Sequence, residues 1–251
     1  MRKWLLVAFI FGYSVVAQPL LAQDLTVAVA ANAQQVFERL RSEFEKESGI
    51  KIAAVIGSSG KLTSQIEHGA PFDVFLSADS EYPARLFLTQ FATNAPRIYA
   101  RGVLALWTAT GAPISQRLLD LTSAKIKRIA IADPTNAPYG RETVVALRRL
   151  GLYDKLKEKI VFAESIAQVN QYVTIGSVDV GFTSLSSVTA LDPVKTKACE
   201  LNRDDYTPIP QAAVILRHGY DSHREASEKF FAFLFSPLAR DIFRTAGYLD
   251  P

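Results

Sequence analysis

From residue 25 onward, short apolar runs rich in β-branched residues alternate with segments whose apolar positions recur at helical spacing. The apolar runs predict strands, and small polar residues bound most of them. We expect strands at 25–30, 50–56, 73–77, 103–108, 126–132, 160–163, 178–182 and 212–216.

The segments between these strands predict amphipathic helices. One is expected to begin with Asn32 as its cap and to run to Gly49, and another to begin after Ser165 and to end at Gly176. Further helices are expected at 62–68, 142–150, 225–235 and 238–246. Strands that alternate with helices predict an α/β architecture with mostly parallel sheets.

The first 22 residues have the pattern of a secretory signal peptide. Arg2 and Lys3 precede an uncharged, largely apolar stretch that ends at Ala22, where we expect cleavage; Ala17 is the alternative site. A membrane anchor is disfavoured because Pro19 interrupts the stretch. Localisation in a bacterial periplasm is the expectation.

Charge and cysteine content narrow the function further. Removing residues 1–22 takes away two of 28 basic residues and none of 25 acidic ones, so the net charge falls from +3 to +1. A nearly neutral chain is an improbable partner of nucleic acid. Cys199 is the single cysteine, so no intramolecular disulfide and no paired-cysteine zinc site is available.

The segment 57–63, with the sequence GSSGKLT, superficially resembles a phosphate-binding loop. The spacing fails, because Val55 stands where a glycine is required and Leu62 stands where a serine or threonine would hold magnesium. Two interpretations remain open: an ordinary turn, or a magnesium-free oxyanion site built from the same backbone.

Catalytic and metal sites find little support in the sequence. The three histidines, His68, His218 and His223, lack a ligand spacing near a carboxylate cluster and are interpreted as solvated surface residues. Asp73 and Asp79 bracket a strand and are given structural roles, Asp79 as a helix cap. A secreted hydrolase with Ser59 or Ser184 as nucleophile is kept as an alternative, although no nucleophile-elbow motif is present.

Four strand-to-helix junctions carry small or hydrogen-bonding residues, at 31–33, 58–60, 137–140 and 164–166. Each leaves backbone N–H groups without helical partners, and each helix adds a partial positive charge at its start. Any one junction is compatible with an ordinary cap. Together, in an exported chain without catalytic machinery, they favour capture of a small anion between facing sheets.

At these residues the chain resembles the periplasmic molybdate-binding proteins of ABC transporters, which have the type II periplasmic binding-protein fold. The resemblance covers nearly the whole mature chain. Its most specific segments are 57–60, 65–66, 69–71, 73–75 and 77–79, and the segments 133–134, 137–140 and 150–152 are nearly as specific.

The resemblance implies two α/β lobes, each a mixed, mostly parallel sheet flanked by helices, with the ligand in the cleft between them. Residues 24–100 and 212–251 would form lobe I, and residues 101–211 would form lobe II. Strands near Val103 and Ala213 would act as the hinge. The ligand would be a tetrahedral molybdate or tungstate dianion, bound without a neutralising cation, direct protein–metal ligands or a cofactor.

Carried over by position, the oxyanion ligands are Asn32, through its side-chain amide or backbone N–H, the Ser59 hydroxyl, and the backbone amides of Tyr139 and Ile166. Ala31 and Ser184 are weaker candidates, and Ser184 stands where one branch of the family has a tyrosine. That branch has serine where Asn32 stands. Lys61 and Arg141 adjoin the loops and are expected to point to solvent.

The expected protein is a monomeric receptor that performs no covalent chemistry and delivers its anion to a membrane permease. Phosphate is disfavoured, because its proton needs an acceptor and the four loops offer only Glu164. Sulfate remains an alternative ligand, since its separation from molybdate depends on cavity radius. Ferric iron is disfavoured because the loops offer one tyrosine and no histidine.

Overall fold

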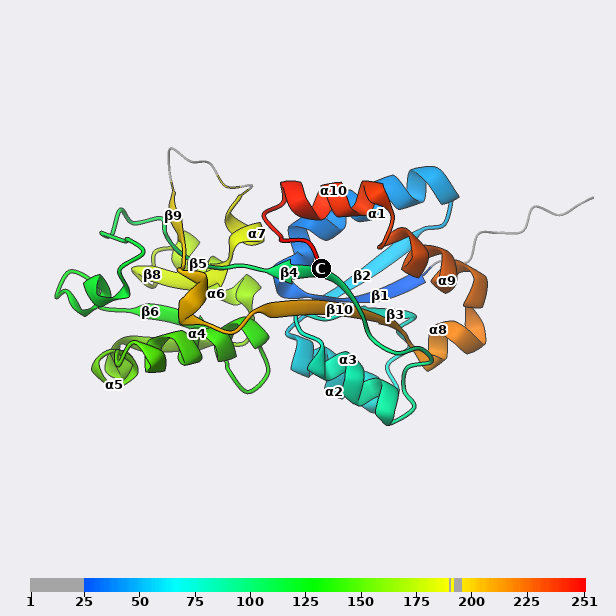
Figure 1. The fold of residues 1–251 in the computed structure, drawn as a ribbon, viewed down its shortest axis with the longest axis horizontal. Coiled ribbons are helices and arrows are strands. Elements are labelled where there is room, and N and C mark those ends of the chain that lie inside the picture. Colours follow the sequence, from blue (N-terminus) through cyan, green and yellow to red (C-terminus); the bar gives the residue numbers. More distant parts are fainter. Residues whose placement is uncertain (1–24, 190, 192–195) are drawn as a thin grey trace, which may run out of the picture.

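Two five-stranded sheets lie side by side along the long axis of the molecule, each with helices on its faces (Figure 1). The computed structural model describes residues 25–189, 191 and 196–251. The predicted signal peptide, residues 1–22, lies outside them. We call the sheet that contains β1 and its helices lobe I, and the other sheet and its helices lobe II.

The sheet of lobe I has the strand order β2-β1-β3-β10-β4. Its strands are β1 (Leu25–Ala30), β2 (Ile52–Gly57), β3 (Val74–Leu76), β4 (Arg97–Gly102) and β10 (Ile209–Ile215). Its helices are α1 (Gln34–Ser48), α2 (Ser59–Glu67), α3 (Glu81–Leu88), α8 (Arg217–Ser222), α9 (Arg224–Phe233) and α10 (Pro237–Thr245). Figure 1 shows α1, α9 and α10 over one face of the sheet and α2 and α3 over the other.

The apolar stripe of α1 explains its place on the sheet. Val36, Phe37, Leu40 and Phe44 are all buried, and they recur at the helical spacing that the sequence predicted. The ring of Phe44 meets Phe230 of α9 edge to face, with 5.1 Å between centroids. The helix ends at a left-handed glycine, Gly49, as expected.

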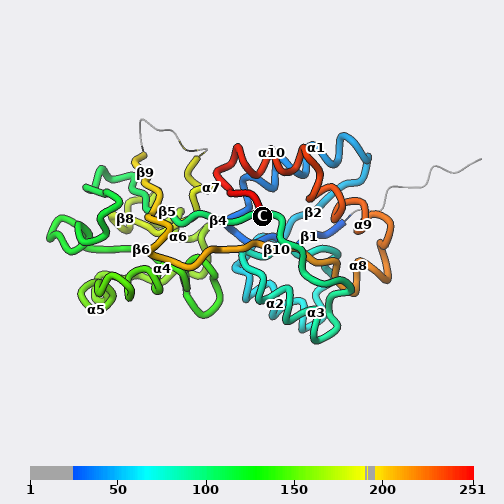
Figure 2. The backbone as a smooth tube through the Cα atoms, in the orientation of Figure 1, coloured from blue at the N-terminus to red at the C-terminus, as the bar shows by residue number. Residues whose placement is uncertain are grey.

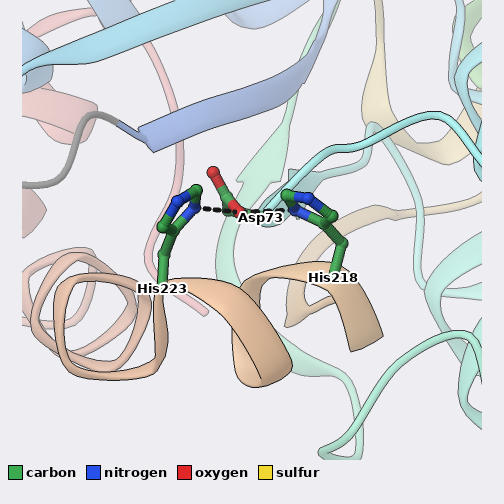
Figure 3. A group of neighbouring side chains, drawn as sticks. All are labelled: Asp73, His218 and His223. Atoms are coloured by element: carbon green, nitrogen blue, oxygen red, sulfur yellow. Dashed lines mark hydrogen bonds and ion pairs between the residues drawn. The ribbon is translucent and has the colours of Figure 1, made fainter.

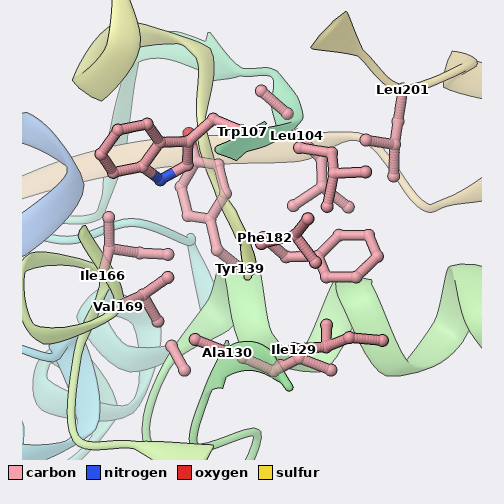
Figure 4. Close-up of a cluster of buried hydrophobic side chains, with 14 of the residues drawn as sticks. Leu104, Trp107, Ile129, Ala130, Tyr139, Ile166, Val169, Phe182 and Leu201 are labelled. Carbon is pink, nitrogen blue, oxygen red and sulfur yellow. The ribbon is translucent and has the colours of Figure 1, made fainter. Parts of the chain in front are cut away.

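The sheet of lobe II has the strand order β7-β6-β8-β5-β9. Its strands are β5 (Leu104–Thr108), β6 (Ile129–Ala132), β7 (Ile160–Ala163), β8 (Val180–Ser184) and β9 (Lys197–Glu200). Its helices are α4 (Pro138–Arg149), α5 (Tyr153–Leu156), α6 (Ile166–Thr174) and α7 (Leu185–Val188). Trp107, Phe182 and Val169 are buried at the centre of its core (Figure 4).

Both sheets are more mixed than expected. In each, two neighbouring pairs are parallel and two are antiparallel. The antiparallel pairs arise because β10 in lobe I and β5 in lobe II run against both of their neighbours. These strands belong to the segments in which the chain passes between the sheets.

The chain passes from lobe I to lobe II between β4 and β5, and returns between β9 and β10 (Figure 2). A β-bulge interrupts β10 between Gln211 and Ala212. The expected lobe boundaries, at residues 101 and 211, stay predictions.

Two helices near the interlobe cleft begin earlier than expected. α2 begins at Ser59 rather than residue 62, and α4 begins at Pro138 rather than residue 142. Asn32 is not a helix cap, because it lies inside a short 3-10 turn and its side chain bonds elsewhere. Ser165 does cap α6, and its Oγ accepts the N–H of Gln168. Within the described part of the chain, no helix is both long and apolar enough to span a bilayer.

Candidate functional site

A small cavity lies at the carboxyl ends of the strands, where the two lobes meet. Its wall includes Ala31, Asn32 and Ser59 from lobe I and Tyr139 and Ile166 from lobe II. The cavity is small, with a volume of about 10 Å³, so only a compact guest fits. The structure therefore brings together all four main predicted ligand residues and Ala31.

Helix starts supply most of this wall. Ser59 is the first residue of α2, Tyr139 the second residue of α4 and Ile166 the first residue of α6. The first N–H groups of a helix have no acceptor within that helix, and the helix dipole adds partial positive charge there. Three helix starts from two lobes thus converge on one cavity.

Two serine hydroxyls add side-chain donors. The Oγ of Ser59 accepts the N–H of Ala78 at 2.9 Å, and no hydrogen bond among the described residues uses its hydrogen. Ser58 also lines the cavity, and its buried Oγ has no partner among the described residues. Both hydroxyls can donate to a guest. The sequence placed Ser58 in the junction without selecting it as a ligand.

The side-chain amide of Asn32 is already committed to the protein. Its Nδ2 donates to Oε1 of Gln211 at 2.9 Å and to the hydroxyl of Tyr248 at 3.0 Å. Those two bonds use both amide hydrogens, so the backbone N–H is the donor that Asn32 has left for a guest. Of the two routes expected for this residue, the structure favours the backbone.

Tyr139 likewise offers its backbone rather than its side chain. Its hydroxyl accepts the Nε2 hydrogen of Gln211 at 2.8 Å, and the side chain is buried in the core of lobe II. Burial raises the pKa of this phenol well above its usual value, so it stays neutral.

Ser184 is not one of the described residues that form the cavity wall. Its Oγ lies 2.7 Å from the Oγ of Ser187 and 2.9 Å from the Oγ of Ser186. Ser186 in turn donates to the backbone carbonyl of Asn32 at 3.1 Å. The structure therefore gives Ser184 a place behind the turn at Asn32.

No charged side chain is among the residues that form the cavity wall. The expectation that Lys61 and Arg141 point to solvent holds for Lys61, whose side chain is exposed although it is paired, and is wrong for Arg141, which is partly buried. Lys61 pairs with Glu164 at 2.5 Å, and Arg141 pairs with Asp79 at 3.0 Å and also with Glu81. Each pair joins the two lobes, because opposite charges from facing helix starts meet there.

The backbones of the two lobes also make direct contact. The N–H of Gly60 donates to the carbonyl of Asn136 at 2.9 Å, and the hydroxyl of Tyr82 donates to the carbonyl of Thr135 at 3.1 Å. A Cβ on Gly60 would lie 2.9 Å from the Cα of Asn136. A glycine is therefore needed for this approach.

The interpretation of the histidines as scattered surface residues is wrong for two of them. His218 and His223 both direct Nδ1 at Oδ1 of the buried Asp73 (Figure 3). His218 and Asp73 are separated by 145 residues, so no sequence spacing reveals this group. Asp79 does accept the N–H of Tyr82 at 3.2 Å, as expected of a capping residue.

Known proteins resemble the whole described chain. Residues 25–249 match the family described as bacterial extracellular solute-binding protein. The molybdate-binding protein ModA of Azotobacter vinelandii is 37% identical over 90% of each chain. The ModA of Rhodobacter capsulatus is 33% identical over 93% of this chain and 91% of its own.

Solved structures agree with these sequence relatives. The periplasmic molybdate-binding protein of Azotobacter vinelandii superimposes with a TM-score of 0.84, covering 90% of this chain and 99% of that one at 33% identity. The sulfate-binding protein SubI of Mycobacterium tuberculosis shares the fold at a TM-score of 0.76, with 13% identity, 90% coverage of this chain and 86% of its own. The chain therefore belongs to the bacterial extracellular solute-binding proteins and, among them, to the family of the molybdate-binding protein ModA.

Proposed function

We propose that this protein captures molybdate, and tungstate with it, as a tetrahedral dianion and delivers it to the permease of an ABC transporter. The single observation that carries this proposal is the cavity between the lobes, where three helix starts and two serine hydroxyls converge without a charged side chain. As a solute-binding protein it performs no covalent chemistry, so the alternative of a secreted hydrolase is set aside.

Neutral donors are sufficient for a doubly charged guest. Moving an ion out of water costs several kcal/mol unless its oxygens are met by hydrogen bonds. A hydrogen bond to a charged group contributes about 1.5–3 kcal/mol. The backbone N–H groups of Asn32, Ser59, Tyr139 and Ile166 and the hydroxyls of Ser58 and Ser59 together offset that cost in this proposal.

The donor set also favours anions that carry no proton. Molybdate, tungstate and sulfate accept hydrogen bonds at every oxygen, whereas phosphate near neutral pH also needs an acceptor for its own proton. No carboxylate is among the residues of the cavity wall. Between sulfate and molybdate, the choice of molybdate rests on the likeness to the ModA proteins, since SubI shares only the fold.

Delivery follows from closure of the lobes. In the proposed cycle the protein acts in the periplasm as a monomer, after cleavage of residues 1–22. The strands around Val103 and Ala213 bend as the lobes close on the anion. The ion pairs of Lys61 and Arg141 then stabilise the closed form that the permease recognises.

Calorimetric titration of the mature protein with molybdate, tungstate, sulfate and phosphate tests the proposal. We expect molybdate and tungstate to bind one to one, more tightly than sulfate by at least tenfold, and phosphate to bind weakest. Tighter binding of sulfate or phosphate than of molybdate would overturn the assignment of the ligand.

A further inference from the structure

A second group of ligand-like side chains lies at the opposite end of the lobe I sheet from the anion cavity. Asp73 immediately precedes β3, whereas Ala78, after the same strand, lines the cavity. At about 3.3 Å per residue, five residues of extended chain separate the two places by roughly 16 Å. His218 belongs to α8, and His223 joins α8 to α9.

The three side chains converge on one point. Nδ1 of His218 lies 2.9 Å from Oδ1 of Asp73, and Nδ1 of His223 lies 3.0 Å from the same oxygen. The three candidate ligand atoms all lie within 4.8 Å of one another, and no other such group of three or more is found in the described residues. Figure 3 shows both rings turned toward the carboxylate from opposite sides.

The carboxylate is held in place by the fold. Its Oδ2 accepts the backbone N–H of Thr26 at 2.6 Å, which leaves Oδ1 to face the two rings. The backbone carbonyl of Asp73 accepts the N–H of Leu216, just before α8. A Cβ on Gly219 would lie 2.4 Å from that carbonyl, so α8 packs directly against Asp73. The positions of the histidines are thereby fixed relative to the acid.

The group is also reachable from solvent. Asp73 is buried, but the side chains of His218 and His223 are 37% and 27% exposed. His218 borders an open hollow of about 310 Å³ together with Asp221 and Ser222. His218 is the one member of the group that lines this hollow, so an ion would approach from the His218 side, where a water could complete its coordination.

We propose that Asp73, His218 and His223 form a binding site for a divalent transition-metal ion of the zinc type. Two imidazoles and one carboxylate are a donor set that zinc uses, and it differs from the all-oxygen sets preferred by magnesium and calcium. With ligands about 2.0 Å from the metal, tetrahedral geometry separates them by about 3.3 Å. The two Nδ1–Oδ1 distances of 2.9 and 3.0 Å need to widen by only a few tenths of an ångström, and the two Nδ1 atoms, which lie within 4.8 Å of each other, need to take the same spacing.

Proton positions are compatible with this binding. In the neutral tautomer that carries its hydrogen on Nδ1, each ring can donate that hydrogen to Oδ1 of Asp73, which would keep the ring in place. When the ion binds at Nδ1, that hydrogen moves to Nε2 of the same ring, and no net proton is lost.

Zinc titration of the mature protein, prepared without an affinity tag, tests this site. We expect one zinc ion per chain, at least tenfold weaker binding in His218→Gln and in His223→Gln, and unchanged binding in His68→Gln. His68 is the matched control because it is the remaining histidine, and its Nδ1 faces the carbonyl of Ser64 at the end of α2. Replacing zinc by cobalt should give the visible absorption of a tetrahedral ion in the unaltered protein and lose it in His223→Gln.

Molybdate titration and thermal unfolding of each variant show that it is folded, and they keep this proposal separate from the function of the cavity. Absence of stoichiometric zinc binding at micromolar concentrations would overturn the proposal. The proposal would also be overturned if His68→Gln weakened zinc binding as much as His218→Gln and His223→Gln do, or if none of the three variants changed the zinc affinity.

Discussion

The two ends of the lobe I sheet present opposite chemistry. At the carboxyl ends of β1 and β3, backbone amides and hydroxyls surround a cavity whose wall contains no charged side chain. At the amino end of β3, a buried carboxylate meets two imidazoles. Helices that follow parallel strands begin at the carboxyl ends, so positive dipole ends gather there. The proposed anion site thus uses the geometry of the fold itself, whereas the proposed cation site depends on individual side chains.

Gly60→Ala should have the largest effect of the substitutions, and it should act on the anion cavity but not on the group at Asp73. The added Cβ would lie 2.6 Å from the hydroxyl of Tyr82, 2.9 Å from the Cα of Asn136 and 3.0 Å from its carbonyl oxygen. Tyr82 can move aside, but the backbone at Asn136 cannot do so without separating the lobes. We expect molybdate affinity to fall at least 100-fold in calorimetry, while zinc binding is unchanged. Closure of the variant around molybdate, with native affinity, would contradict this account.

Ser59→Ala should have the next largest effect. It removes one hydroxyl donor to a charged guest, which we expect to weaken molybdate binding by about 1.5–3 kcal/mol. It also leaves the N–H of Ala78 without its side-chain acceptor, so the free energy of unfolding should fall by about 1–3 kcal/mol.

Ser64→Ala is the matched control for Ser59→Ala, because Ser64 is an exposed serine on the same helix. We expect no change in its molybdate affinity, measured in the same titration. Equal affinities for Ser59→Ala and Ser64→Ala would remove Ser59 from the site.

Asp79→Asn gives the smallest expected effect and tests the charges beside the anion cavity. Burial raises the pKa of Asp79 above its ordinary value of 3.8, although the N–H of Tyr82 and the charge of Arg141 oppose the shift. A raised pKa means that the carboxyl group favours the folded state most below pH 3.8, and this contribution is lost as pH rises through the folded pKa.

The stability of the unaltered protein, relative to Asp79→Asn, should therefore decline from pH 3.5 to pH 7. Urea unfolding of both proteins at several pH values measures this difference. If the unaltered protein instead gained stability over Asp79→Asn as the pH rose, the ion pair with Arg141 would have a larger effect on the pKa of Asp79 than its burial has.

The sequence predicted which junctions line the cavity because its signals are local. Each ligand candidate lies where an apolar run gives way to a helix start, and parallel strands bring such junctions to one edge of a sheet. The lengths of α2 and α4 were underestimated, because Ser59 and Pro138 read as turn residues before the first apolar positions. The commitment of the Asn32 amide to Gln211 and Tyr248 was not predictable, since those partners lie 179 and 216 residues away.

Charged residues were the least predictable part of the molecule. Lys61 and Arg141 look like solvent-facing residues in sequence, and only the approach of the two lobes gives them Glu164 and Asp79 as partners. The group at Asp73 was not predictable because its histidines lie far away in the sequence. The chain reaches α8 only after it has passed through lobe II and returned to lobe I. The share of antiparallel pairs was underestimated, because the alternation of strands and helices does not report the direction in which β5 and β10 run.

The side chain of Gln211 has a consequence for how the protein moves. It lies beside the bulge in β10, its carbonyl accepts hydrogen bonds from Asn32 and Tyr99 of lobe I, and its amide donates to Tyr139 of lobe II. A half-open molecule would strand these buried groups without partners, which is costly. We therefore expect opening and closing of the lobes to be cooperative, with the turn at Asn32 and the strand β10 changing together.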